Sequence, residues 1–168
     1  MWQKYIRDVV DFPQKNILFK DITPLLLNAK ASAACLDALS AMAPNNIDSV
    51  AAIDSRGFIF GSLLAQRFQV PFVPIRKQGK LPYNTISKTY KLEYGTATLE
   101  MHTDALKPGQ NVLLHDDVLA TGGTAKAACE LIEQLGAKVV QCNFILEITA
   151  LKGRQKFLNY NLKAAMEV

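Results

Sequence analysis

The 168-residue sequence lacks any acidic residue between Ser55 and Leu92, although the whole chain contains 15 aspartates and glutamates. Seven cations in this stretch leave the rest of the chain with a net charge of −3, against +4 overall. They are Arg56, Arg67, Arg76, Lys77, Lys80, Lys88 and Lys91. A segment with charge of one sign indicates a polyanionic partner. The stretch has no pattern of interleaved stacking aromatics and no DNA-reading motif, so a small substrate with several phosphates fits at least as well as nucleic acid.

Cysteine is also scarce, and its spacing excludes several classes of site. Cys35, Cys129 and Cys142 form no Cys-x-x-Cys or zinc-ligand pattern, so we expect reduced, mostly buried thiols. No apolar run approaches the length of a membrane span, and the first residues lack the apolar core of a signal peptide. With 49% hydrophobic and 20% charged residues, the composition is that of a globular chain within the size of one domain. We therefore expect a cytoplasmic protein with no membrane or nucleic-acid partner.

Residues 112–124 contain the most informative motif of the sequence. An apolar run leads to Asp116 and Asp117, and the segment 121–124, Thr-Gly-Gly-Thr, then opens a helix. Glycine N–H groups, threonine hydroxyls and the helix N-terminus together suit a phosphate. Carboxylates suit a neighbouring diol instead, because each can accept two hydroxyl hydrogen bonds. A Gly-Gly turn alone is common in α/β proteins, but two unpaired carboxylates at a buried strand end are costly, which favours a ribose 5-phosphate site.

The order of the predicted elements indicates an α/β fold. Strands alternate with helices, which predicts a parallel sheet with ligands outside the carboxyl ends of its strands. Segments 54–57 and 116–124 both follow predicted strands, so they meet at one edge of one sheet. We expect helices over residues 2–10, 30–43, 58–68 and 124–135, with Thr23-Pro24 starting another, and strands over 49–53, 71–75, 96–102, 111–115 and 138–148. Residues 12–22 are expected to be extended, and 76–91 to form a long loop.

Five segments resemble one known family. Asp116–Thr124 resembles the phosphoribosyl pyrophosphate (PRPP) motif of the type I phosphoribosyltransferases. The segments 12–24, 54–58, 76–82 with 92–95, and 151–154 resemble the purine-site segment, pyrophosphate loop, mobile catalytic loop and C-terminal signature of the adenine phosphoribosyltransferase family. The resemblance implies a single α/β domain, 1–168, of the type I phosphoribosyltransferase fold, with a twisted, mostly parallel sheet flanked by helices. It also implies a small N-terminal hood over about 1–30 and a mobile loop over about 76–95.

The resemblance further implies a purine salvage enzyme that transfers the 5-phosphoribosyl group of PRPP to N9 of adenine, giving AMP and pyrophosphate. Alternatives are a 6-oxopurine or orotate phosphoribosyltransferase, and a PRPP-sensing regulator without turnover. The implied cofactor is Mg²⁺ bound through PRPP and water, with no all-protein metal site, and the implied assembly is a homodimer. The implied PRPP-binding residues are Ser55, Arg56, Gly57, Arg76, Lys77, Lys80, Asp116, Asp117, Ala120, Thr121, Gly122, Gly123 and Thr124.

The resemblance also implies which residues act on the base. Glu93 is expected to handle the purine proton, with Tyr94 beside it and Arg56 on the leaving diphosphate. The implied adenine-binding residues are Leu18, Phe19, Lys20, Val118 and Leu119.

Three positions near these sites bear on the choice of base and on the packing. Ala120 stands where 6-oxopurine transferases typically have an aspartate, which favours adenine. His115 and Asn16 depart from the family pattern. We expect a structural histidine at 115, although the neighbouring carboxylates could raise its pKa.

Overall fold

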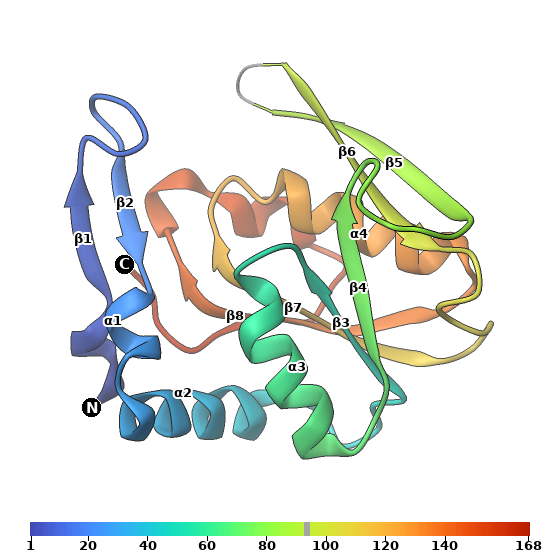
Figure 1. Ribbon diagram of the computed structural model, residues 1–168, viewed down its shortest axis with the longest axis horizontal. Coiled ribbons are helices and arrows are strands. Elements are labelled where there is room, and N and C mark those ends of the chain that lie inside the picture. Colours follow the sequence, from blue (N-terminus) through green and yellow to red (C-terminus); the bar gives the residue numbers. More distant parts are fainter. Residues whose placement is uncertain (93–94) are drawn as a thin grey trace.

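A computed structural model describes residues 1–92 and 95–168, and its centre is a twisted sheet of seven strands (Figure 1). The strand order is β5-β6-β4-β3-β7-β8-β9. Neighbours from β4 to β9 are parallel, whereas β6 runs antiparallel to both β4 and β5. The strands are β3 (Ser49–Ile53), β4 (Phe72–Lys77), β5 (Thr85–Lys91), β6 (Thr96–His102), β7 (Asn111–Leu119), β8 (Lys138–Glu147) and β9 (Leu162–Ala164). The predicted mostly parallel α/β sheet is confirmed.

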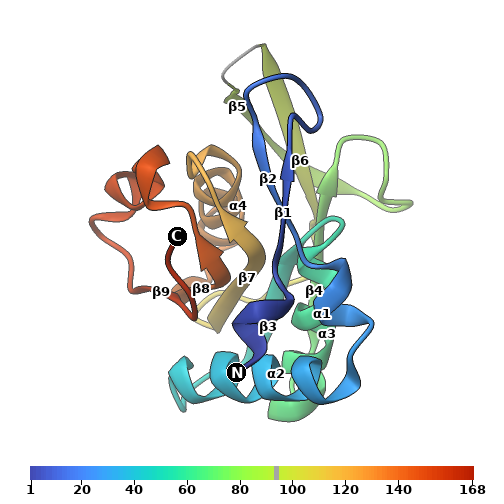
Figure 2. The same cartoon turned by 90° about the vertical axis from the view of Figure 1, so that its left-hand side faces the viewer.

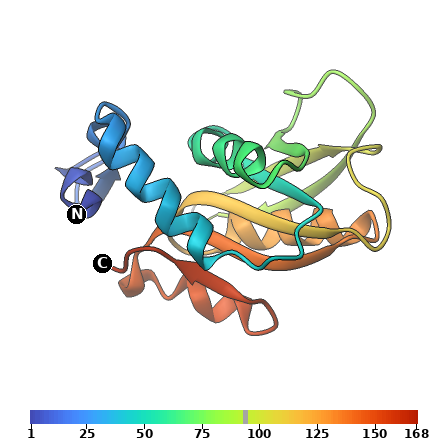
Figure 3. The same cartoon turned by 90° about the horizontal axis from the view of Figure 1, so that it is seen from below.

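Helices cover both faces of this sheet, as the view from below shows (Figure 3). On one face α2 (Ala29–Met42) and α3 (Gly57–Phe68) pack in one apolar cluster, and on the other α4 (Gly123–Gln134) packs in a second, with the short helix η3 (Gly153–Phe157). In β7, Val112 and Leu114 join the α4 cluster while Leu113 joins the α2–α3 cluster, because successive strand side chains point to opposite faces. The sheet is therefore buried on both sides, and its strand ends remain available for a site.

The N-terminal segment forms a hood of its own beside the main sheet (Figure 2). It comprises η1 (Trp2–Tyr5), the antiparallel pair β1 (Arg7–Val10) and β2 (Leu18–Asp21), and α1 (Thr23–Leu26). The predicted helix over 2–10 is wrong, because β1 pairs with β2 and this long-range pairing outweighs the helical spacing of the apolar residues. Thr23 is the first residue of α1 and not its N-cap; its N–H donates to the Asp21 carboxylate at 2.8 Å.

The predicted long loop over 76–91 is also wrong. β4 continues to Lys77, and 85–91 is β5, which pairs along its whole length with β6. A cross-strand hydrogen bond joins the Thr89 and Thr98 hydroxyls at 2.9 Å. Only residues 78–84 connect β4 and β5, and β5 forms a two-stranded ribbon with β6. The hood and this ribbon flank the carboxyl ends of β3 and β7 from opposite sides (Figure 1).

β7 extends four residues beyond its predicted end at residue 115. Its pairing with β8 runs on to Leu119 opposite Glu147, so Asp116 and Asp117 lie within the strand and not after it. The short helix η2 (Thr149–Leu151) follows β8. Among the described residues, no helix has the length and apolar character needed to cross a membrane.

Candidate active site

A cavity of about 430 Å³ lies at the carboxyl ends of β3 and β7, where the sequence places its motifs. It brings together Ser55, Arg56, Lys77, Asp116, Asp117, Val118, Leu119, Ala120, Thr121, Gly122 and Thr124 from the predicted site. It does not include Gly57, Gly123, Arg76, Lys80, Leu18, Phe19 or Lys20 in its lining. The cavity also has lining residues that sequence reasoning did not select, namely Ile53, Asp54, Tyr90, Leu92, Ala97, Leu99 and Ala125.

The loop between β7 and α4 forms one wall of this cavity. Gly122 takes a left-handed conformation, with φ +78°, and is the N-cap of α4. The first turn of a helix leaves backbone N–H groups without intrahelical partners, and the helix dipole adds positive potential there. This geometry suits a phosphate at the loop.

The C-terminal segment supports the same loop from behind. A Cβ atom on Gly153 would lie 2.1 Å from the Ala120 carbonyl oxygen, and one on Gly122 would lie 2.8 Å from the Gly153 carbonyl oxygen. The two backbones are therefore too close for any side chain between them. This contact gives a physical reason for a glycine in the Leu-Lys-Gly-Arg segment, which lies 30 residues after the loop in sequence.

The two adjacent carboxylates lie in a desolvated position. Asp117 is 4% exposed, and the Nε atom of Arg56 lies 2.8 Å from its Oδ2 atom. Asp116 Oδ1 accepts a hydrogen bond from the Asp117 N–H at 2.9 Å. Burial raises the pKa of both carboxyl groups; the charge of Asp117 raises the pKa of Asp116 further, while Arg56 opposes the rise in both. Such a pair favours ligands that bring hydroxyl donors or positive charge.

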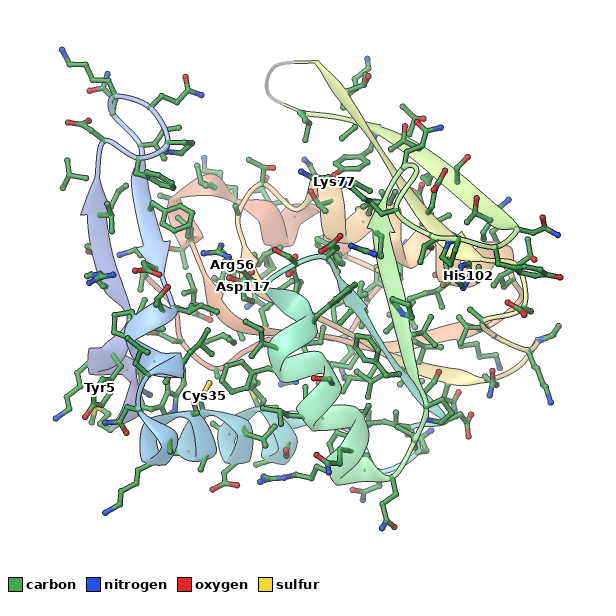
Figure 4. The ribbon with its side chains drawn as sticks, in the orientation of Figure 1. Tyr5, Cys35, Arg56, Lys77, His102 and Asp117 are labelled. Atoms are coloured by element: carbon green, nitrogen blue, oxygen red, sulfur yellow. The ribbon has the colours of Figure 1, made fainter. Side chains whose placement is uncertain are left out.

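Arg56 connects this carboxylate pair to the hood. Besides Asp117, its guanidinium donates to the Lys20 carbonyl oxygen at 3.2 Å and lies 4.7 Å from the centre of the Phe19 ring. Phe19 also meets Phe12 edge-on at 5.0 Å. The predicted purine-site segment therefore reaches the cavity through Arg56. Figure 4 shows Arg56 and Asp117 next to each other above α3.

The predicted cations of β4 and of the connection that follows it divide into two groups. Lys77 lines the cavity, whereas Arg76 binds Asp54 at 3.0 Å and the Lys80 carbonyl oxygen at 3.0 Å. The nearby Gly79 N–H donates to the buried Glu100 carboxylate at 2.9 Å. Arg76 therefore holds the 78–84 connection in place. The Asp54–Ser55 peptide bond in the pyrophosphate segment is cis.

Glu93 and Tyr94, which the sequence assigns to catalysis, lie outside the described residues. Leu92, directly before them, lines the cavity. Within the described part of the chain, no group of three or more His, Cys, Asp or Glu side chains is placed to hold a metal ion.

His115 and the cysteines are structural. His115 is fully buried, its Nδ1 lies 3.1 Å from Asn143 Oδ1, and burial lowers its pKa to about 4. The raised pKa considered from sequence is therefore wrong, and the structural interpretation is confirmed. All three cysteines are buried free thiols, as expected.

Comparison with known proteins identifies the family of this chain. The phosphoribosyl transferase domain family matches residues 20–163. The chain therefore belongs to the phosphoribosyltransferases. It is 56% identical over 165 residues to adenine phosphoribosyltransferase of Flavobacterium johnsoniae, covering 98% of this chain and 97% of the relative.

Solved structures agree in fold. Adenine phosphoribosyltransferase from Thermoanaerobacter pseudethanolicus superimposes with a TM-score of 0.96 at 47% identity, covering 99% of this chain and 97% of that one. The Saccharomyces cerevisiae enzyme, solved with an imino-altritol bisphosphate and adenine, gives a TM-score of 0.92 at 39% identity, covering 98% and 96%. Within its family, the chain belongs to the adenine phosphoribosyltransferases.

Proposed function

We propose that the cavity at the ends of β3 and β7 binds PRPP and adenine and forms AMP and pyrophosphate. The observation that supports this proposal is that the glycine-containing loop before α4 and the Asp116–Asp117 carboxylates line the same cavity. A ribose 5-phosphate has the matching chemistry, because its phosphate suits the loop and its hydroxyls suit the carboxylates. Family membership favours adenine over a 6-oxopurine or orotate acceptor, and favours turnover over a regulator without activity.

Catalysis in this proposal is mainly electrostatic. As the bond between C1 of the ribose and the diphosphate breaks, positive charge grows on the ribose and negative charge on the leaving group. The positive charge on the ribose is stabilised by Asp116 and Asp117. The leaving diphosphate is bound by Ser55, Arg56 and Lys77. Because Arg56 contacts both Asp117 and the hood, it also ties the diphosphate side of the cavity to the purine side.

The base is proposed to lie between the hood and the end of β7. Val118 and Leu119 line the cavity and offer an apolar face, and Phe19 offers a ring on the hood side. The Arg56 guanidinium now lies against the Phe19 ring, so adenine either takes its place or stacks on the other ring face. Glu93, which follows the lining residue Leu92, is proposed to exchange the purine proton.

Mg²⁺ is proposed to enter with the substrate. In the described residues the carboxylates nearest the diphosphate position already have basic partners, Arg76 for Asp54 and Arg56 for Asp117. Because these carboxylates are already paired, the site fits an ion that keeps its waters and binds chiefly to phosphate oxygens of the substrate. When bound, the ion would neutralise charge on the leaving diphosphate, while Arg56 and Lys77 orient it.

We also propose that the protein forms a homodimer and that it works in the cytoplasm. Ile59 and Leu63 lie four residues apart on α3, each 37% exposed, so they form an apolar strip on the surface. Buried free thiols suit a reducing compartment. If α3 forms the interface, Leu63→Glu will shift the mass measured by analytical ultracentrifugation from dimer to monomer; an unchanged dimer will exclude that face.

The activity itself is tested by incubating the protein with PRPP, adenine and Mg²⁺ and measuring AMP and pyrophosphate chromatographically. Equal amounts of both products are expected. The Asp117→Asn variant, which keeps the side-chain shape, should form them at least about tenfold more slowly. Formation of neither product by the unaltered protein would refute the proposed function.

A further inference from the structure

Tyr90 of β5 is a cavity residue that no sequence motif singled out. Its hydroxyl oxygen accepts a hydrogen bond from the Thr124 hydroxyl at 3.2 Å, which places it at the phosphate-binding loop. Its ring lies over the loop, with Cδ2 3.6 Å from the position that a Cβ on Gly123 would occupy. Tyr90 is half-buried and packs against the same apolar cluster as α4. The hydroxyl groups of Tyr90 and Thr124, which are far apart in the sequence, therefore lie side by side in the cavity.

The position of Tyr90 is fixed by the way β5 lies on α4. Ile86, Lys88 and Tyr90 alternate along the strand, so their side chains point to the same face. Ile86 packs into the α4 cluster, and Lys88 forms an ion pair with Glu130 of α4 at 2.7 Å. Tyr90 meets Thr124, so Lys88 and Tyr90 both contact α4 and Ile86 packs against the apolar cluster to which α4 belongs. The phenol of Tyr90 is thus held at the loop by the pairing of β5 and its packing on α4.

The chemistry of the pair indicates what a ligand would find there. A phenol oxygen that accepts one hydrogen bond still has its own proton to donate. A phosphate at the N-terminus of α4 would lie beside the Thr124 hydroxyl, so a phosphate oxygen is the natural acceptor for the Tyr90 proton. Hydrogen bonds to a charged acceptor are stronger than those between neutral groups, and the half-buried setting strengthens them further.

We propose that Tyr90 binds the 5-phosphate of the ribose, donating its phenol proton to the phosphate while it accepts from Thr124. This inference rests on the proposed function of the loop as the 5-phosphate site. It adds a donor from the β5–β6 ribbon to a loop otherwise built from β7 and α4. Binding of the 5-phosphate then also stabilises the ribbon against α4.

The test compares two anions by isothermal titration calorimetry. Ribose 5-phosphate probes the loop, and pyrophosphate probes the Ser55–Arg56 side of the cavity. In Tyr90→Phe, ribose 5-phosphate should bind about tenfold more weakly, as expected for one lost hydrogen bond to a charged group. Pyrophosphate affinity should not change. Tyr83→Phe is the matched control, because it also removes one phenol hydroxyl, but from a residue that is 60% exposed and does not line the cavity. This variant should bind ribose 5-phosphate and pyrophosphate as tightly as the unaltered protein.

Three outcomes would overturn the inference. Unchanged ribose 5-phosphate affinity in Tyr90→Phe means that the hydroxyl does not contact the phosphate. Tighter binding means that Tyr90 competes with the phosphate for Thr124. Equal weakening of both anions means a general disturbance of the cavity. Failure of the unaltered protein to bind ribose 5-phosphate at all is a different result, because it refutes the proposed function of the loop before Tyr90 is considered.

Discussion

Replacing Gly153 with alanine should displace the proposed phosphate-binding loop, although Gly153 does not line the cavity. The added Cβ atom would lie 2.1 Å from the Ala120 carbonyl oxygen and 3.1 Å from the Gly122 nitrogen. Real Cβ atoms essentially never approach a neighbour within 3.0 Å, so the loop and the C-terminal segment must separate by close to an ångström. Both neighbours are backbone, and no rotamer change can relieve the contact.

The size of the effect follows from this displacement. Inserting a methyl group into a packed contact costs about 1–3 kcal/mol, which for a chain of this length lowers the Tm by roughly 2–12 °C. The larger effect is on activity, because misplacing a binding group by about 1 Å can cost about a hundredfold in rate. We therefore expect kcat/KM for PRPP to fall much more than the loss of stability would explain.

Calorimetric unfolding and steady-state kinetics on the same preparation test this reasoning. Gly109→Ala is the control: Gly109 has φ +84°, so alanine strains the backbone, but nothing lies within 4 Å of its Cβ position and it does not line the cavity. It should lose stability by about 1–2 kcal/mol and keep its kcat/KM. The reasoning is refuted if Gly153→Ala keeps the activity of the control.

Three further variants test other parts of the account. Asp116→Asn should lower kcat/KM at least about tenfold yet raise the stability of the fold. Burial and the neighbouring Asp117 charge raise the pKa of Asp116 above its ordinary value of 3.8, so the ionised form destabilises the fold. Urea unfolding should therefore show a stability gain in Asp116→Asn that is absent at low pH and grows as the pH rises above about 4. Glu93→Gln should lower kcat far more than PRPP affinity, and an unchanged kcat would exclude the proton-handling role. His115→Val should reduce the loss of stability on acidification between pH 6.5 and about 4, because His115 is buried uncharged with its pKa lowered to about 4; an identical pH profile would exclude this cause.

Local sequence signals predicted the centre of the fold and one wall of the cavity. Ser49–Ile53 and Thr96–His102 were predicted with the observed bounds, and the loop before α4 was predicted from its glycines and threonines alone. These elements depend on nearby residues: apolar runs, caps and turn chemistry. The parallel order of strands then placed both motifs at one sheet edge.

Long-range pairing explains what the sequence did not reveal. The apolar residues of 2–10 have helical spacing, but Arg7–Val10 becomes a strand because β2 lies opposite. Likewise, Thr85–Lys91 is a strand because β6 pairs with it. This second error is why the sequence did not reveal Tyr90 as a cavity residue, since a residue in a predicted loop has no defined face. The support of the loop by Gly153 is equally invisible in sequence, because the contact joins Gly153 to Ala120 and Gly122, which lie more than 30 residues earlier.

Competition between purine bases tests the central claim most directly. The protein would be given adenine, hypoxanthine and guanine at equal concentrations with limiting PRPP, and the nucleotides would be separated and quantified. The account predicts AMP with little IMP or GMP, because Ala120 provides no carboxylate for a 6-oxopurine. In addition, backbone carbonyl oxygens of the Leu18–Lys20 segment could accept a hydrogen bond from the 6-amino group of adenine, whereas a 6-oxo group would set oxygen against oxygen. If hypoxanthine reacts within a factor of about ten of adenine, the account of base selection is contradicted.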